Sequence, residues 1–314
     1  MKKKLSTVFL EVFLLYFIFL LFFHSKECME LAAKGLLIWF QKMIPSLFPF
    51  MILSGFMIRS GLSVKFGKLL QPLNLIFHLP SQMLYVIFMG FLCGFPMGAK
   101  IIADMLEKEQ ITLKEGEYLL AFCNNIGPLY ILGYVIPLFQ WKNNLELITL
   151  MYGVPLLYGI FLRYFTKYKN IRSKNVLLKN YYSTDYLTHL SSSLTAAIEQ
   201  ITMLGGCMIF FNCLQIFPLI LCSAFHNYIP KEILQSILCS LTEIGGGLSL
   251  LANLNKNISL IPISISLLTF GGMSCLFQTY LILKKTNLHI RPYLKHKLIQ
   301  ALLIYVIYFS IFSI

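Results

Sequence analysis

The sequence predicts an all-α polytopic membrane protein, and three observations lead to this fold class. Hydrophobic residues make up 57% of the 314-residue chain and charged residues only 12%, about half the fraction usual in soluble domains. Most of its apolar runs reach the roughly 20 residues that a bilayer core requires. Most of the basic residues lie between these runs, so the net charge of +13 indicates membrane orientation rather than nucleic-acid binding. The runs cover residues 7–23, 32–58, 82–106, 117–139, 146–163, 194–222, 233–253, 258–283 and 298–314.

The first apolar run predicts a retained membrane span rather than a cleaved signal peptide. Lys2, Lys3 and Lys4 precede it, which favours a cytoplasmic N-terminus under the positive-inside rule. The segment that follows, HSKECME, lacks the small-x-small pattern of a cleavage site. We therefore expect residues 1–31 to form an N-terminal anchor span.

The distribution of Lys and Arg predicts that two of the apolar runs do not cross the membrane. If all of them crossed, the basic loop 163–179 would lie outside, against the positive-inside rule. A re-entrant run at 82–106 moves this loop to the cytoplasm, and a re-entrant run at 233–253 does the same for the basic loop 284–297. The cytoplasmic set then holds 19 of the 26 basic residues. The two loops contribute Arg163, Lys167, Lys169, Arg172, Lys174, Lys179, Lys284, Lys285, Arg291, Lys295 and Lys297.

Each re-entrant run predicts a helical hairpin that is interrupted within the membrane. The stretch GFLCGFPMGAKIIADM at 90–105 carries three glycines and a proline, and SLTEIGGG at 240–247 interrupts the other run. An arm of about 12 residues spans about 18 Å of helix, which is less than the roughly 30 Å of a bilayer core. Non-helical backbone at this depth is tolerated only where it is buried in protein or lines a cavity. The breaks therefore indicate places where the backbone is buried in protein or lines a cavity.

An internal repeat follows from the spacing of these breaks. When the sequence is aligned with itself at an offset of 148 residues, the two hairpins coincide. The same offset pairs LLAFCNNIGPLYILG at 119–133 with LLTFGGMSCLFQTYL at 267–281. We predict two units of span, re-entrant hairpin, broken span and span, at 32–163 and 191–314, joined by a cytoplasmic linker at 164–190. Each unit crosses three times, so the second is inverted relative to the first. Inverted repeats with paired broken helices are typical of secondary transporters.

We expect the two hairpin tips and the two broken spans to converge on one substrate site. Free backbone amides at half-helix N-termini attract an anion, and free carbonyls at C-termini attract a cation. The candidate binding residues are Gly94, Pro96, Gly98, Lys100, Asn124, Asn125, Gly127, Thr242, Glu243, Gly245, Gly246 and Ser274.

The polar residues of this set have alternative interpretations. Lys100 either contacts an anionic substrate or pairs with Asp104, four residues on along the same helix face. Glu243 either carries a coupling proton or cation, or is a protonated carboxyl that hydrogen-bonds to neighbouring backbone. Asn124 and Asn125 either bind a polar ligand or hydrogen-bond between helices.

The histidine and cysteine patterns argue against an enzyme. The six histidines lie in loops or at their edges, and neither an HExxH motif nor a Walker A sequence is present. The eight cysteines show no CxxC spacing, and most lie inside apolar runs, where free cysteine packs as a small apolar residue. We therefore expect no catalytic residues, no metal and no cofactor.

The strings GFPMGAK at 94–100 and FCNNIGP at 122–128, with IPSLFPFMILSGFMI at 44–58, carry a family resemblance. On these motifs the chain resembles the sporulation integral membrane protein YlbJ family, whose nucleoside-recognition Gate domain also occurs in nucleoside transporters and ferrous iron permeases. The resemblance covers nearly the whole chain. It implies an architecture similar to concentrative nucleoside transporters, with hairpins and unwound helices around a central site.

The resemblance also implies a function in endospore formation. A member of this family is expected to be a secondary transporter that moves dipicolinic acid across the outer forespore membrane. Dipicolinate is a planar dianion, which suits Lys100 and half-helix N-termini. A nucleoside or other polar solute, or a non-transporting scaffold for spore assembly, remain alternatives. The expected partners are the small anionic substrate, a coupling proton or cation, and the lipid bilayer; homo-oligomerisation is left open.

Overall fold

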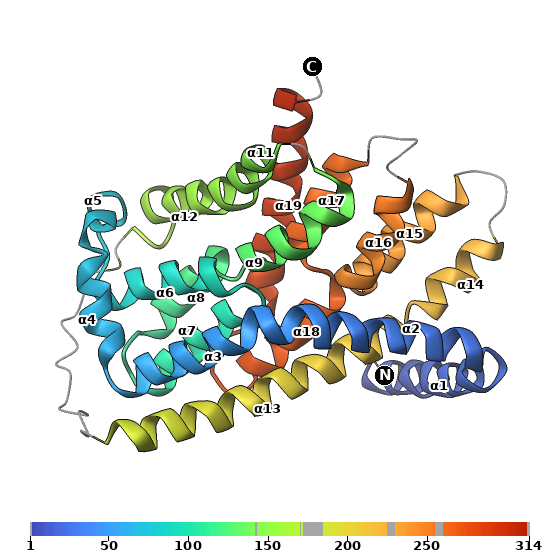
Figure 1. The fold of residues 1–314 in the computed structure, drawn as a ribbon, viewed down its shortest axis with the longest axis horizontal. Coiled ribbons are helices and arrows are strands. Elements are labelled where there is room, and N and C mark those ends of the chain that lie inside the picture. Colours follow the sequence, from blue (N-terminus) through green and yellow to red (C-terminus); the bar gives the residue numbers. More distant parts are fainter. Residues whose placement is uncertain are drawn as a thin grey trace.

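The computed structural model describes residues 2–141, 143–169, 171, 185–224, 230–254 and 260–312, and this part of the chain is helical without a strand (Figure 1). Its first half contains α1 (Lys2–Phe23), α2 (Ser25–Ile38), η1 (Trp39–Met43), α3 (Ile44–Arg59), α4 (Leu62–Leu69), η2 (Gln71–Leu73), α5 (Asn74–Phe77), α6 (Ser81–Cys93), α7 (Met97–Glu107), α8 (Leu113–Cys123), α9 (Pro128–Tyr130), η3 (Ile131–Val135), α10 (Ile136–Phe139), α11 (Asn144–Ile148), η4 (Thr149–Gly153) and α12 (Val154–Phe165). Its second half contains α13 (Tyr186–Cys213), α14 (Ile216–Ala224), α15 (Lys231–Thr242), α16 (Ile244–Leu254), α17 (Ile261–Phe270), α18 (Gly272–Leu283) and α19 (Ile290–Phe312).

Within the described residues, six helical segments are long and apolar enough to cross a membrane, and they match six of the seven runs predicted to cross. The seventh, the apolar part of α1 at Thr7–Phe23, is helical but shorter. Phe9, Phe165 and Leu187 each expose more than 70% of their surface, and a surface with many such side chains belongs in lipid. The prediction of a polytopic all-α membrane protein is therefore confirmed. The six segments are Ser25–Arg59, Leu113–Phe139, Asn144–Phe165, Tyr186–Ser223, Ile261–Leu283 and Ile290–Ile311.

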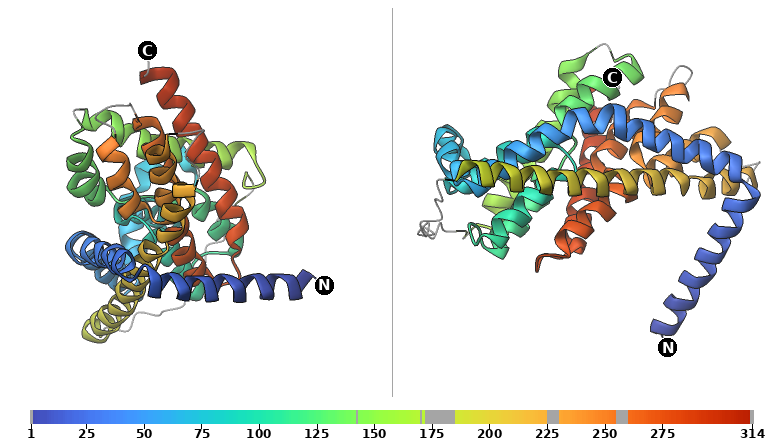
Figure 2. Two further views of the ribbon diagram at one scale, coloured as in Figure 1. Left: turned by 90° about the vertical axis from the view of Figure 1, so that its right-hand side faces the viewer. Right: turned by 60° about the horizontal axis from the view of Figure 1, so that its bottom comes forward.

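Two long segments lie antiparallel along one side of the molecule, side by side in both views (Figure 1; Figure 2, right): α2, η1 and α3 in one, and α13 in the other. Small residues allow this contact. A Cβ added to Gly35 would lie 2.9 Å from the carbonyl oxygen of Met208, and one added to Gly205 would lie 2.4 Å from the Trp39 ring. The Trp39 indole nitrogen donates to the carbonyl oxygen of Ile201 at 2.9 Å. Both segments are longer than the roughly 20 residues that cross a bilayer core, so they must tilt or extend beyond it.

Three π-helical segments occur where a proline follows within a turn. η1, η3 and η4 each lead into an α-helix with proline in its first two positions: Pro45, Pro137 and Pro155. Proline lacks an amide hydrogen, and its ring clashes with the carbonyl one turn earlier. The local widening of the helix accommodates that clash and leaves the segments continuous.

Both predicted hairpins are present as pairs of short helices. Hairpin 1 consists of α6 and α7, which are 13 and 11 residues long; hairpin 2 consists of α15 and α16, which are 12 and 11 residues long. At 1.5 Å per residue no arm exceeds about 20 Å, so none crosses a bilayer core alone. The break at Glu243 lies 148 residues after Phe95, which is the spacing predicted for the repeat. The re-entrant path and the inversion of the second unit remain predictions.

The two broken spans are also interrupted where the sequence indicated. Helical structure stops after Cys123 and resumes at Pro128. α17 ends at Phe270, and the next residue, Gly271, has φ 86°. This left-handed backbone favours glycine. The two breaks interrupt Leu113–Phe139 and Ile261–Leu283, on which the tips of the hairpins converge.

Several predicted boundaries shift in the structure. The helix that leads into the apolar run 32–58 begins at Ser25, and the helix that contains the run 194–222 begins at Tyr186, within the predicted linker. Most of that linker, residues 170 and 172–184, lies outside the described residues. A helix continues through polar residues when one face stays packed, so the ends of the apolar runs underestimate its length.

Arg163, which the sequence analysis assigned to the cytoplasmic basic loop 163–179, is a buried residue of α12. Its guanidinium donates to five backbone carbonyls, at distances between 2.7 and 3.1 Å. Two of these carbonyls precede hairpin 1 and three follow α12, so Arg163 joins the two segments. The acceptors are the carbonyl oxygens of Phe77, His78, Tyr168, Lys169 and Ile171.

Candidate functional site

The tip of hairpin 1 packs directly against the break of the first broken span. A Cβ on Gly94 would lie 2.5 Å from the amide nitrogen of Gly127, and one on Gly98 would lie 2.3 Å from the carbonyl oxygen of Cys123. The amide of Ala99, in the first turn of α7, donates to the side-chain oxygen of Asn124 at 3.3 Å. Glycines at these positions therefore allow the two interrupted backbones to touch.

A polar face of α19 covers the other side of the same break. Tyr293, Lys297 and Gln300 follow one another at helical spacing, so they lie on one face of the helix. The Asn124 amide donates to the Tyr293 hydroxyl at 2.9 Å, the Lys297 ammonium to the Asn125 side-chain oxygen at 2.8 Å, and Gln300 to the carbonyl oxygen of Ala121 at 2.6 Å. The two asparagines thus form helix-to-helix hydrogen bonds, which was one of their predicted roles.

Lys297 is a buried membrane charge that the sequence interpretation placed in a cytoplasmic loop. The structure shows it with no exposed surface, and that assignment is wrong. Its ammonium lies 4.7 Å from the centroid of the Phe95 ring at the tip of hairpin 1. None of the ion pairs among the described residues includes it. The signal that could have identified it was the four-residue spacing from Tyr293 and the three-residue spacing to Gln300.

The tip of hairpin 2 is organised around the buried carboxylate of Glu243. Its Oε2 accepts hydrogen bonds from the Gly246 amide at 2.6 Å and from the Asn212 side chain at 3.0 Å. Gln215 donates to the Glu243 carbonyl oxygen at 3.2 Å. Lys34, which the sequence analysis did not select, donates to the Gly246 carbonyl oxygen at 2.9 Å. α2 and α13, which pack against each other, therefore both hold the tip of hairpin 2.

Both tips pack against the second break and line a small cavity. The Phe95 ring would lie 3.1 Å from a Cβ on Gly271, and the Ser240 carbonyl oxygen would lie 3.0 Å from one on Gly272. Tyr134 donates to the Gly245 carbonyl oxygen at 2.8 Å, which links hairpin 2 to the first broken span. The predicted convergence of four interrupted segments is therefore present.

This central cavity has a volume of about 40 Å³ and is lined by both halves of the chain. Phe95 and Gly127 come from the first half, and Glu243 and Cys275 from the second. A water molecule needs roughly 10–15 Å³ measured in this way, so the space holds about three waters. A ligand with an aromatic ring enters only if the tips move apart.

Tyr130 places a polar group at this cavity without a partner among the described residues. The side chain is 4% exposed and lines the cavity, and its buried hydroxyl makes no hydrogen bond there. It lies 3.3 Å from the position of a Cβ on Gly245. Since a buried hydroxyl without a partner costs about 1–3 kcal/mol, such a group indicates a ligand or ordered water.

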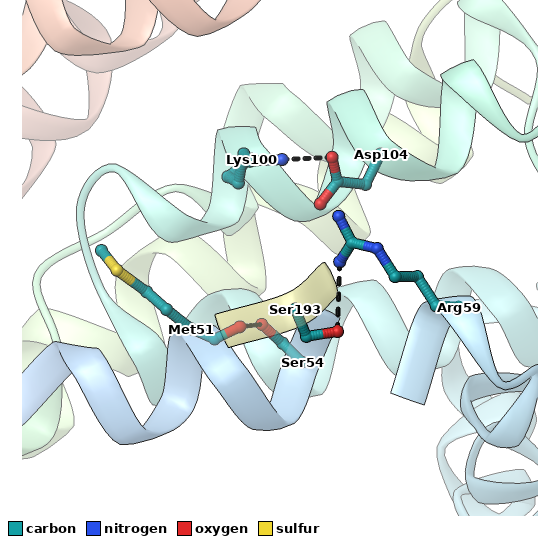
Figure 3. Close-up of polar contacts among 6 residues, drawn as sticks. All are labelled: Met51, Ser54, Arg59, Lys100, Asp104 and Ser193. Atoms are coloured by element: carbon teal, nitrogen blue, oxygen red, sulfur yellow. Dashed lines mark hydrogen bonds and ion pairs between the residues drawn. The ribbon is translucent and has the colours of Figure 1, made fainter. Parts of the chain in front are cut away.

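Lys100 lies away from the central cavity and forms its predicted ion pair with Asp104 (Figure 3). Both residues line a larger vestibule of about 570 Å³, with Gln200 and Lys285. Figure 3 also shows the Arg59 guanidinium pointing toward Asp104 while it donates to the Ser193 hydroxyl at 3.3 Å. Under the predicted orientation the vestibule opens to the cytoplasm. Contact between Lys100 and a substrate stays a prediction.

The remaining candidate residues have local partners. The Pro96 carbonyl oxygen accepts from the Lys100 amide at 3.1 Å, the Thr242 hydroxyl donates to the Leu238 carbonyl oxygen at 2.9 Å, and Ser274 accepts from Gln278 at 3.1 Å. In the described part of the chain, no group of three His, Cys, Asp or Glu residues has the geometry to hold a metal ion.

Comparisons with known proteins identify one informative relative. No protein-family model matches the chain, and no solved structure matches it. Sporulation integral membrane protein YlbJ of Bacillus subtilis (strain 168) is 26% identical over 332 residues, which cover 95% of this chain and 81% of that protein. This similarity extends over both hairpins and both broken spans. It supports the resemblance to the sporulation integral membrane protein YlbJ family that the sequence motifs predict.

Proposed function

We propose that the protein is a secondary transporter of a small aromatic carboxylate, with dipicolinate as the expected substrate. One observation carries the proposal: two helical hairpins and two interrupted helices meet at a cavity lined by both halves of the chain. Interrupted helices at membrane depth offer free backbone groups to a ligand and its coupling ion. A structural scaffold does not need interrupted helices, whose free backbone groups destabilise the interior of a membrane protein.

The relative's name supports a role in sporulation, so we propose that the protein acts in the outer forespore membrane. An anionic substrate is favoured over a neutral nucleoside, because a fully buried lysine lies beside the cavity. An uncompensated charge inside a membrane protein is a functional residue by default. Protons or cations that bind near Glu243 would drive the transport.

Purified protein in liposomes tests the proposal directly. We expect uptake of radiolabelled dipicolinate above that of empty liposomes, and we expect excess unlabelled dipicolinate to compete while uridine and adenosine do not. Competition by nucleosides would instead identify a nucleoside transporter. Absence of any uptake, with the protein folded and inserted, would support the scaffold alternative.

A further inference from the structure

We propose that the Lys297 ammonium is the anion-binding group of the central site, and that the Phe95 ring covers it until a ligand arrives. This inference rests on the proposed transport function and specifies its ligand as a planar aromatic compound with a carboxylate at the Lys297 end. The argument begins with the charge itself. Lys297 has no exposed surface, and its hydrogen bond is to a neutral amide oxygen, that of Asn125.

A purely structural role does not explain a charge at this position. Three residues further along the same face of α19, Gln300 holds the break of the first broken span through a neutral hydrogen bond to the Ala121 carbonyl oxygen at 2.6 Å. A glutamine at 297 would offer the same kind of donor without the cost of a buried cation. A lysine at this position is explained by an anionic ligand that binds beside it.

Phe95 contacts both Lys297 and the cavity. Its ring contacts the ammonium on one side, at 4.7 Å from the centroid, and it lines the cavity. Cation–π attraction partly compensates the buried charge, but a charge-assisted hydrogen bond to a carboxylate is stronger. An aromatic carboxylate that moves the ring aside therefore gains the stronger interaction and keeps an aromatic group in the same region.

Two further groups define the other end of the ligand. The Tyr130 hydroxyl lines the cavity without a partner among the described residues, so it is available to donate to a second acceptor. Glu243 also lines the cavity, and its Oε2 is bound by Asn212 and Gly246. With the proposed coupling proton on Glu243, this end accepts the second carboxylate of dipicolinate while the first binds Lys297.

The test compares binding of dipicolinate with binding of its neutral diamide, pyridine-2,6-dicarboxamide, to purified protein by isothermal titration calorimetry. Lys297→Gln keeps a donor for Asn125 and removes the charge. We expect it to weaken dipicolinate binding on the order of 30-fold or more, as for loss of one partner of a buried charge pair, with little change for the diamide. Lys295→Gln, which removes an exposed lysine from the same helix, serves as the matched control and should change both affinities only slightly.

Phe95→Leu provides a second measurement that leaves Lys297 in place. The Phe95 ring competes with the ligand for the Lys297 ammonium. Without the ring, dipicolinate should bind several-fold more tightly. If Lys297→Gln and Phe95→Leu both bind dipicolinate as tightly as the wild-type protein does, the assignment of Lys297 is overturned while the proposed function stands. If the wild-type protein binds no dipicolinate, the proposed function fails and this inference fails with it.

Discussion

Glu243 accepts a hydrogen bond from the side-chain amide of Asn212 at 3.0 Å, and this bond joins the tip of hairpin 2 to the long helix α13. The same Oε2 atom accepts from the Gly246 amide, so the carboxylate also closes the turn of its own hairpin. These two donors meet one oxygen, so a neutral amide can replace the carboxylate as their acceptor. The proposed role of the negative charge in coupling can therefore be tested separately.

Glu243→Gln should separate hairpin structure from ion coupling. The glutamine carbonyl oxygen can accept both hydrogen bonds, so we expect the protein to insert and to retain its thermal stability within about 1 kcal/mol. Uptake of dipicolinate driven by a pH gradient should fall at least tenfold, whereas exchange of dipicolinate without a gradient should persist. Gradient-driven uptake equal to that of the wild-type protein would exclude Glu243 as a coupling group.

Alanine at Gly98 or Gly247 should force the hairpins away from their neighbours. An added Cβ would lie 2.3 Å from the Cys123 carbonyl oxygen in the first case and 2.3 Å from the Ser240 backbone in the second. Backbone atoms cannot rotate away, so we expect a loss of about 1–3 kcal/mol in stability, measured by thermal unfolding in detergent. Gly206→Ala is the control, because nothing lies within 4 Å of its added Cβ. Equal unfolding temperatures for all three variants would contradict the packing.

Arg163→Lys should destabilise the connection between α12 and the segment before hairpin 1. The planar guanidinium of Arg163 donates to five carbonyl oxygens. Lysine has three donors on a flexible side chain and cannot reproduce this arrangement. We expect a loss of about 2 kcal/mol or more, since buried acceptors lose their partners. The same change at Arg291, which is exposed on α19, should have no measurable effect on the unfolding temperature. If both variants unfold at one temperature, this role of Arg163 is wrong.

Cysteine labelling tests the re-entrant path of hairpin 1. Of the eight native cysteines, seven are buried and Cys275 is partly buried, so background labelling should be low. The exposed positions Lys108 and Asn144 are suitable for substitution by cysteine. A membrane-impermeant maleimide applied from outside to intact cells that express the protein in their plasma membrane should label Asn144→Cys and not Lys108→Cys. Labelling of the second variant would mean that hairpin 1 crosses the membrane.

The sequence alone determined the class of the fold and the positions of its breaks. Apolar length separates crossing segments from hairpin arms, because the bilayer core has one thickness. Glycine and proline mark where helical backbone stops, because their conformational properties are local. Gly94, Gly127 and Gly271 therefore lie at interruptions that could be predicted without knowledge of their neighbours in space.

Only the tertiary structure decided which charges face the site. Lys297 adjoins a stretch of basic residues in the sequence, so it was assigned to the loop, yet α19 carries it into the interior. Lys100, beside the most conspicuous motif, turns instead to Asp104 and the vestibule. The direction of a side chain depends on how its helix rotates against others, and that rotation is set by contacts such as Lys297 with Asn125, 172 residues apart.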